Sequence, residues 1–229
     1  TRIQIGFEAA GKRRIYVQDD GEGMSPEDAQ LALRRHATSK LRSAEDLLRI
    51  GSLGFRGEAL ASIASVARFA LRTRRPEDLE GTQLYTQGGA IPRAGACGMA
   101  PGTQIQVDDL FYCVPARAKF LKSDRTETSH IMECVRAYAL AHPHVGFTLQ
   151  EGAREIFSLP AVRSFEDRLY TLYSLQDPLL PVSAMGFNLQ IQGLISPPGL
   201  GHPNGSYMLI LLNGRPVESL PLLQAAREA

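Results

Sequence analysis

The hydrophobic and polar positions of the N-terminal two thirds of the chain follow two periodicities, which predict strands and helices in mixed order. Residues 2–7 and 13–18 alternate on either side of Gly11, and this pattern indicates an antiparallel strand pair. The other segments follow the same two rules: strands are expected at 66–73, in two or three segments within 81–107, at 145–150 and at 154–159, and helices at 25–35, from 43 onwards, at 58–65 and at 124–141.

Pro160 marks a predicted domain boundary, which separates a first domain, 1–160, from a second, 161–229. The second domain is expected to contain a helix at 164–174, strands at 187–195 and 207–213 around a Gly/Pro-rich loop, and a helix from Ser219. The order of elements predicts an α/β (α+β) fold whose strands pair in both directions.

Composition narrows the class of protein. Hydrophobic residues make up 44% of the chain, which is enough for a sizeable core. The 25 Lys and Arg against 24 Asp and Glu argue against a wholly basic nucleic-acid coat, although a local basic patch stays open. Cys97, Cys113 and Cys134 form no CxxC pair, so neither a disulfide framework nor a zinc site is expected, and a reducing cytoplasm fits best. No apolar run approaches the roughly 20 residues that span a bilayer, so no membrane partner is expected.

The segment Asp19-Asp20-Gly21-Glu22-Gly23-Met24 lies at the end of a predicted strand. A carboxylate fixed there accepts a hydrogen bond from an exocyclic amine such as that of adenine, and it repels the carbonyl that guanine presents at the same place. Gly21 and Gly23 would let the backbone approach a flat ring. The alternative is a turn rich in Asp and Gly.

A glycine-rich segment, 51–57, runs directly into a predicted helix. Free amide groups at such a helix start form an anion site suited to the phosphates of a nucleotide. The segment is neither a P-loop nor a dinucleotide fingerprint. A surface loop is the alternative. The candidate phosphate-binding residues are Leu53, Gly54, Phe55, Arg56, Gly57 and Glu58.

Two further segments carry candidate chemistry. Thr38, Ser39 and Lys40 follow His36 and could close over phosphates as a lid, or could form a solvated loop. His36 itself fits a helix C-terminus better than a metal-ligand or catalytic role. Thr103 begins a predicted strand and could support the adenine-facing carboxylate through its hydroxyl, although many threonines there reflect β-propensity alone.

Taken together and in this order, these segments resemble the ATPase region of MutL proteins, members of the GHKL group that shares the Bergerat ATP-binding fold with gyrase B, histidine kinases and related chaperones. The most particular matches are His36–Lys40, Gly54–Ile63 and Asp109–Arg117. The resemblance covers essentially the whole chain. It implies a Bergerat-type sandwich with a mixed sheet, followed by a partial second domain like ribosomal protein S5, with a left-handed β-α-β crossover.

The resemblance also implies roles for individual residues. Asp19 would contact adenine, with Gly23 and Met24 beside it and Thr103 near the base. The lid and phosphate residues would be those given above. Arg215, in the segment Leu212–Val217, would point toward DNA, where its fork can engage two phosphate oxygens, or would be an ordinary turn residue.

Three features of the resembling family are not matched. A helix with the Glu that activates water and the Asn that holds Mg²⁺ is expected before Thr1, so we expect the chain to begin within a domain. A Lys that reaches the γ-phosphate is expected beyond Ala229, and Cys113 stands where the family usually has Asn. No catalytic residue and no metal ligand is therefore assigned within this chain.

The implied function is a DNA mismatch repair ATPase, in which ATP binding and slow hydrolysis act as a conformational and dimerisation switch that couples mismatch recognition to downstream repair. ATP, Mg²⁺, DNA, a MutS-type mismatch-recognition protein and an ATP-dependent second copy are the implied cofactors and partners, in a nucleoid-associated cytoplasmic setting. The competing hypothesis is a non-catalytic DNA-binding or scaffold module. A gyrase B-like enzyme is disfavoured by the segments His36–Lys40 and Gly54–Leu60.

Overall fold

A computed structural model of the chain describes residues 1–34, 58–187, 189–200 and 208–228. The chain divides into two compact units, of which the first comprises Thr1–Val135 and Val145–Ala161 and the second Arg136–His144 and Val162–Ala229. The predicted boundary at Pro160 lies next to the junction at 161/162. The second unit also takes the end of the long helix that precedes this junction.

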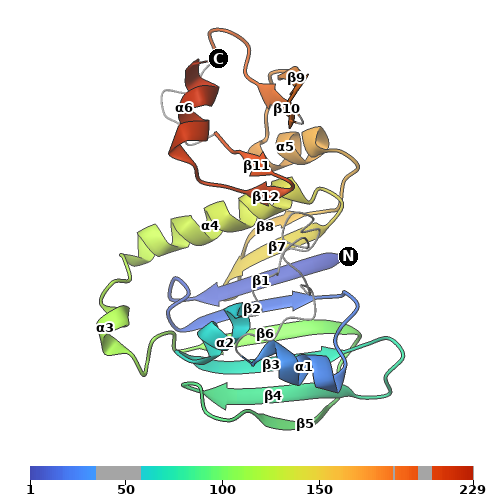
Figure 1. Cartoon of the computed structure of the whole chain (residues 1–229), viewed down its shortest axis with the longest axis vertical. Helices are drawn as coiled ribbons and strands as arrows, with labels where there is room; N and C mark the ends of the chain where they lie inside the picture. Colours follow the sequence, from blue (N-terminus) through green and yellow to red (C-terminus); the bar gives the residue numbers. More distant parts are fainter. Residues whose placement is uncertain (35–57, 188, 201–207, 229) are drawn as a thin grey trace. The chain divides into compact units, whose positions relative to one another are not determined.

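The first unit is built on a mixed eight-stranded sheet (Figure 1). Its strands are β1 (Arg2–Glu8), β2 (Arg14–Asp19), β3 (Arg68–Arg74), β4 (Gly81–Gln87), β5 (Arg93–Cys97), β6 (Gly102–Asp108), β7 (Gly146–Glu151) and β8 (Arg154–Leu159). Their spatial order is β5-β4-β3-β6-β2-β1-β7-β8, with β1 and β7 parallel and the other neighbours antiparallel. The predicted α/β class with strands paired in both directions is confirmed.

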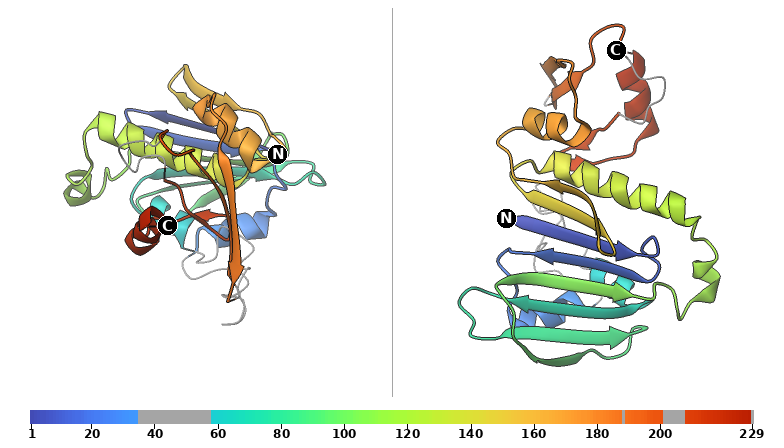
Figure 2. Two further views of the ribbon diagram at one scale, coloured as in Figure 1. Left: turned by 90° about the horizontal axis from the view of Figure 1, so that it is seen from above. Right: turned by 180° about the vertical axis from the view of Figure 1, so that it is seen from behind.

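Two short helices cover one face of this sheet. Helix α1 is Pro26–Ala32 and α2 is Ala59–Ala64. Both lie in front of the sheet in Figure 1 and beyond it when the molecule is seen from behind in Figure 2. The predicted start of α1 is confirmed, because the Ser25 hydroxyl accepts a hydrogen bond from the Asp28 amide at 3.0 Å and Pro26 occupies the first turn.

The core lies between these helices and the sheet. Strand pairing sets Leu84, Leu71, Ile105 and Val17 side by side on β4, β3, β6 and β2. Leu71 and Leu84 are at most 1% exposed and form one cluster with Ala29 of α1 and Ala64 of α2. Small residues on the helices bring them close to the large aliphatic side chains of the strands, so the packing is tight without bulky helix residues.

The opposite face of the sheet is polar. The residues that alternate with the core positions include Gln18, Gln104, Arg72 and Gln83, which pair in register across β2, β6, β3 and β4. An antiparallel sheet with one covered and one solvated face shows this alternation. Two more helices follow β6 in the chain: α3 (Pro115–Ala118), which the periodicity did not predict, and α4 (Asp124–Ala141), whose predicted bounds are confirmed.

The second unit contains α5 (Phe165–Tyr173), β9 (Leu180–Gly186), β10 (Leu189–Ile195), β11 (Leu211–Leu212), β12 (Arg215–Pro216) and α6 (Leu220–Glu228). Strand β9 was not predicted, since no strand was expected between the helix at 164–174 and the strand at 187–195. It is accommodated in a two-stranded sheet, where Pro181 lies opposite Leu194. The strand expected at 207–213 is wrong in extent, since the described part holds only Leu211–Leu212.

No helix among residues 1–34, 58–187, 189–200 and 208–228 is long and apolar enough to cross a membrane.

We expect Leu71→Ala to lower the free energy of unfolding by about 2–5 kcal/mol, because the substitution leaves a cavity in the core cluster. Arg72→Ala is the matched control, since Arg72 is the next residue of β3, points to the other face and is exposed; its effect should stay within about 0.5 kcal/mol. Urea unfolding followed by circular dichroism measures both. Equal losses in the two variants would contradict the assignment of the covered face.

Candidate functional site

At one end of the sheet the helix-covered face changes from apolar to polar. Four polar residues pair with one another in register there: Thr82, Thr73, Thr103 and Asp19. Each lies two positions along its strand from a core residue, which is Leu84, Leu71, Ile105 and Val17, respectively. Side chains two apart on a strand share a face. The row of polar groups is therefore a direct continuation of the core face, and it brings two predicted site residues, Asp19 and Thr103, to adjacent positions.

Asp19 is held by backbone amides. The Gly21 amide donates to Asp19 Oδ1 at 2.9 Å, and the Thr103 amide donates to the same oxygen at 3.3 Å. The first contact is the local turn that Asp favours. Within the described residues, Asp19 Oδ2 accepts no hydrogen bond, and the side chain is half-buried. The carboxylate is fixed through one oxygen and can accept from a ligand through the other.

The loop after Asp19 is tied to β3. The Met24 amide donates to Thr73 Oγ1 at 2.8 Å. Gly23 has φ +69°, and a Cβ at this position would lie 2.1 Å from the Arg74 carbonyl oxygen. Sequence reasoning related this glycine to the approach of a flat ring. In the structure its lack of a side chain lets the loop pack against the end of β3.

A second glycine joins β6 to β2 in the same way. Gly102 has φ +127°, and a Cβ there would lie 2.2 Å from the Asp19 carbonyl oxygen. The backbone positions of Asp19 and Thr103 are therefore set by close contacts that exclude any side chain at position 102.

The turn that follows β3 is closed by Arg75 and Asp78. The Arg75 guanidinium donates two hydrogen bonds of 2.9 Å to the Asp78 carboxylate, and Arg74 Nη1 donates to the Asp78 carbonyl oxygen at 2.9 Å. The hydrogen bonds from Arg75 lower the pKa of the Asp78 carboxyl group. The turn thus fixes the Arg74 backbone on which Gly23 packs.

The predicted nucleotide-binding residues fall into three sets. Asp19, Gly23, Met24 and Thr103 are brought together at the end of the covered face. Glu58 directly precedes α2, where its carbonyl oxygen accepts from the Ser62 amide at 2.8 Å. The remaining candidates lie outside the described residues: Thr38, Ser39, Lys40, Leu53, Gly54, Phe55, Arg56 and Gly57.

Sequence reasoning missed Thr73. It was included in the strand expected at 66–73, where threonine is an ordinary residue. The alternation along the strand could have identified it: Thr73 shares a face with Phe69 and Leu71, and all three are 0% exposed. A hydroxyl on the core face of a strand needs a buried partner, and this requirement distinguishes Thr73 from threonines on the solvated face.

The segment Asp109–Cys113, which carries part of the family resemblance, forms a compact turn. Asp109 and Phe111 have φ of +53° and +65°, and the Phe111 amide donates to the Val66 carbonyl oxygen at 2.8 Å. Arg68 pairs with Asp109 at 3.2 Å and lies 5.2 Å above the Tyr112 ring. Cys113 is exposed, with Sγ 3.7 Å from the Ser65 carbonyl oxygen. These contacts connect the end of β6 to β3 and give the segment a structural role.

In the second unit, Arg215 follows a tight turn. Asn213 and Gly214 have φ of +50° and +73°, and Leu212 pairs with Arg215 across the turn. Two central residues with positive φ are typical of a type I′ hairpin. Arg215 itself is half-buried.

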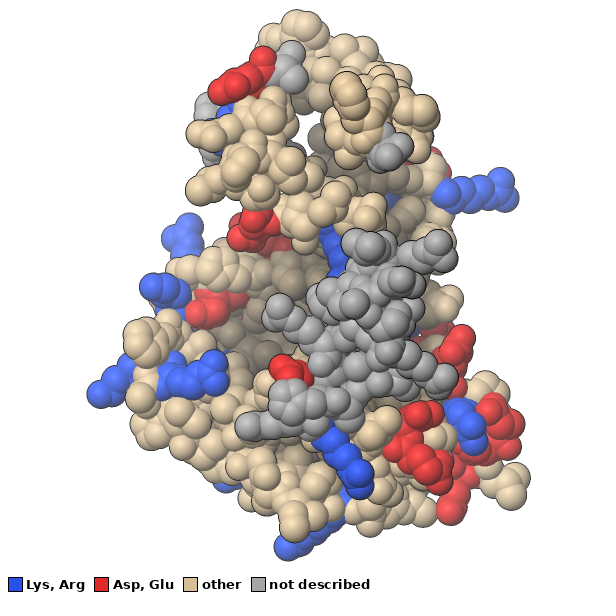
Figure 3. Space-filling model, in the orientation of Figure 1, with Lys and Arg blue, Asp and Glu red and all other residues tan. Residues whose placement is uncertain are grey.

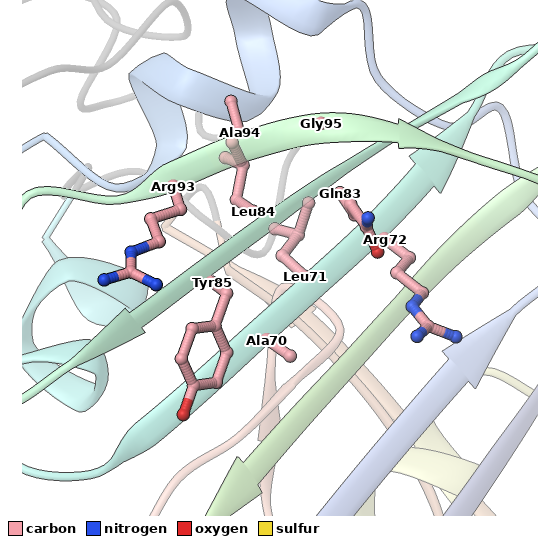
Figure 4. A pocket seen from close by; sticks show the side chains of 9 residues that line it. All are labelled: Ala70, Leu71, Arg72, Gln83, Leu84, Tyr85, Arg93, Ala94 and Gly95. Atoms are coloured by element: carbon pink, nitrogen blue, oxygen red, sulfur yellow. The ribbon is translucent and has the colours of Figure 1, made fainter.

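A hollow of about 300 Å³ lies elsewhere, against strands β3, β4 and β5 (Figure 4). Arg72, Gln83, Tyr85 and Arg93 line it, and these residues belong to the rows that alternate with the core rows. The hollow is therefore on the opposite face of the sheet from Asp19 and is separate from the polar row.

Comparisons with known proteins identify the class of protein that the chain resembles. Residues 1–88 match the family model described as histidine kinase-, DNA gyrase B- and HSP90-like ATPase. The chain is 46% identical over 231 residues to the DNA mismatch repair protein MutL of Opitutus terrae, covering 100% of this chain and 37% of that protein. It is 40% identical over 227 residues to MutL of Streptococcus sanguinis, covering 98% and 35%. The chain thus spans little more than a third of the length of these relatives.

Solved structures agree. The Aquifex aeolicus MutL ATPase domain complexed with ADP superposes with a TM-score of 0.75 and 28% identity, covering 100% of this chain and 80% of that one. The N-terminal domain of a DNA repair protein gives a TM-score of 0.80 at 22% identity, covering 99% and 72%, which supports the fold alone. The fold is that of the GHKL-type ATPase domains. Within that class the chain is similar, over nearly its whole length, to a part of the MutL proteins.

We expect Gly23→Ala to destabilise the protein by more than Gly152→Ala. Both glycines have positive φ, +69° and +58°, which costs a non-glycine residue about 1–2 kcal/mol. A Cβ at position 152 meets nothing within 4 Å, whereas at position 23 it meets the Arg74 carbonyl at 2.1 Å. Urea unfolding of the two variants separates conformational strain from the contact. Equal losses would show that the loop does not depend on packing against β3.

Proposed function

We propose that the chain is the nucleotide-binding part of a DNA mismatch repair ATPase, in which ATP binding and slow hydrolysis switch the conformation of the protein. The observation that carries the proposal is the polar row at the end of the covered face, where Asp19 keeps one carboxylate oxygen for a ligand. A GHKL-type ATP-binding fold and relatives named as DNA mismatch repair proteins support it.

In this proposal the adenine base lies against Asp19 and Thr103. Asp19 Oδ2 accepts a hydrogen bond from the exocyclic amine, and Met24 and Gly23 lie beside the base. A hydrogen bond to a charged group contributes about 1.5–3 kcal/mol. A base with a carbonyl at the same position would place two acceptors against each other, so the site selects adenine over guanine.

The phosphates are assigned to the glycine-rich segment and to the lid. Leu53–Glu58 would bind them through backbone amides before α2, and Thr38, Ser39 and Lys40 would close over them. The motivation is the sequence pattern together with the position of α2, which packs on the same face of the sheet as the polar row.

Mg²⁺ would neutralise charge on the phosphates. Among the described residues no group of three His, Cys, Asp or Glu side chains could hold a metal ion. We assign neither a metal ligand nor a catalytic residue among the described residues. What the described residues do is orient the base and hold the loop after Asp19.

The partners follow from the proposed repair role, which would be carried out in the nucleoid. DNA would contact Arg215. A mismatch-recognition protein of the MutS type and a second copy of the chain would bind when ATP favours one conformation over another. On the face shown in Figure 3, the Lys and Arg side chains stand in small groups with Asp and Glu between them. A non-catalytic scaffold would instead show background ATP turnover in the full-length protein.

We expect Asp19→Asn to weaken binding of a non-hydrolysable ATP analogue by about tenfold or more, because the charged acceptor for the amine is lost. Isothermal titration calorimetry on the full-length protein measures the change. Asp20→Asn is the matched control: Asp20 is the neighbouring carboxylate, is exposed, and accepts from the Arg2 amide. An Asp19→Asn variant that binds as tightly as the Asp20→Asn variant would refute the base site.

We expect Arg215→Ala to weaken binding of duplex DNA at all sequences and to reduce the slope of log K against log salt by about one unit, as for the loss of one phosphate contact. Fluorescence anisotropy over a series of salt concentrations provides the slope. Arg227→Ala, in the exposed α6 of the same unit, is the control. A slope that Arg215→Ala leaves unchanged would remove Arg215 from the DNA contact.

A further inference from the structure

We propose that Thr73 is a positioning residue that determines the hydrogen-bonding character of the nucleotide site. Its hydroxyl accepts a hydrogen bond from the Thr103 hydroxyl, so that Thr103 presents only acceptor lone pairs beside Asp19. This inference rests on the proposed ATP site and names the residue that makes the site selective for a base with an exocyclic amine.

The argument begins with the surroundings of Thr73 Oγ1. The side chain is 0% exposed, so its hydroxyl has only protein partners. Three lie within hydrogen-bonding distance: the Met24 amide at 2.8 Å, the Thr103 hydroxyl at 3.1 Å and the Gly102 carbonyl oxygen at 3.2 Å. Each comes from a segment that forms the polar end of the sheet.

A hydroxyl has one proton to donate and two lone pairs to accept with. The Met24 amide can only donate, so it takes one lone pair of Thr73. The Gly102 carbonyl can only accept, so it takes the single proton of Thr73. All three contacts are then satisfied only if the Thr103 hydroxyl donates to the second lone pair of Thr73.

The consequence lies at Thr103. Once its proton points toward Thr73, the Thr103 oxygen can only accept from other groups. Asp19 Oδ2, on the strand paired with Thr103, is also only an acceptor. The edge of the site is therefore a pair of acceptors, which suits a ligand edge that carries N–H donors and disfavours a carbonyl. Thr73, which is one strand further from Asp19, sets this pattern through Thr103.

Thr73 also fixes the loop. Because the Met24 amide donates to Thr73, the same hydroxyl that orients Thr103 holds the segment after Asp19 against β3. Removal of the hydroxyl should therefore change two properties together: the proton of Thr103 becomes available to a ligand, and Met24 loses its acceptor.

The test compares ATP with ITP, in which a carbonyl replaces the exocyclic amine and N1 carries a hydrogen. Like ATP and unlike GTP, ITP has no amino group at position 2. Binding of the two nucleotides is measured by calorimetry on the full-length protein. We expect the wild type to favour ATP. Thr73→Val keeps the shape and removes the hydroxyl, and it should shrink the ratio of the two dissociation constants by about 3- to 10-fold, the effect of one hydrogen bond.

Two variants control for a purely structural effect. Thr73→Ser keeps the hydroxyl and should retain the wild-type ratio within about twofold. Thr82→Val removes a hydroxyl from the same row, on β4, where none of the hydrogen bonds found among the described residues involves the side chain, and should leave the ratio unchanged. A merely structural role for Thr73 would lower the melting temperature or weaken both nucleotides equally, and would leave the ratio as it is.

The outcomes separate this inference from the proposed function. If the wild type discriminates between ATP and ITP, Asp19→Asn abolishes the discrimination and Thr73→Val preserves it, then Thr73 does not position the site while the site itself stands. If neither the wild type nor Asp19→Asn discriminates, the adenine site is wrong and the inference fails with it.

Discussion

The register between β2, β6 and β3 is the constraint on which the rest of the structure depends. The pleat that points Val17, Ile105 and Leu71 into the core also points the residues two positions further along to the same side. A slip of one residue in any of these pairings would turn an apolar row to solvent and would move Asp19 or Thr103 to the wrong face. The free energy of core burial therefore holds the site in register.

The local contacts refine what the register sets. Gly23 and Gly102 pack their backbones against the carbonyl groups of Arg74 and Asp19, at distances that no side chain permits. Thr73 then connects the loop to the strands through its buried hydroxyl. Strand pairing thus sets which residues are neighbours, the close backbone contacts set the path of the loop, and the Thr73 hydroxyl sets the hydrogen bonds.

Much of this arrangement could be predicted from the sequence. Alternation gave the strand pair around Gly11, and capping chemistry gave the start of α1 at Ser25, because these signals lie within a few neighbouring residues. The bounds of α4 followed from its periodicity and from Pro143. Asp19, Gly23, Met24 and Thr103 were identified as a group, and the structure brings them together.

What could not be predicted depends on long-range pairing. Strand β9 was not predicted. It contains Pro181, a residue that is rare in central strands, and the two-stranded sheet with β10 accommodates it. The role of Thr73 was not predicted because its hydrogen-bond partners are 29 to 49 residues away in sequence. The reason for Gly23 differed from the one assigned to it, since the Arg74 carbonyl that requires it belongs to another strand.

The polar row also has a thermodynamic consequence. Because the row continues the core face without a break, a flat base bound there would extend the interior of the protein by one layer, so ligand binding and folding would draw on the same packed surface. A ligand that binds only the folded state stabilises it by RT ln(1 + [L]/Kd), about 2.7 kcal/mol at a hundredfold excess over Kd. The stability of the paired ends of β2, β6 and β3 would then depend on the cellular concentration of nucleotide.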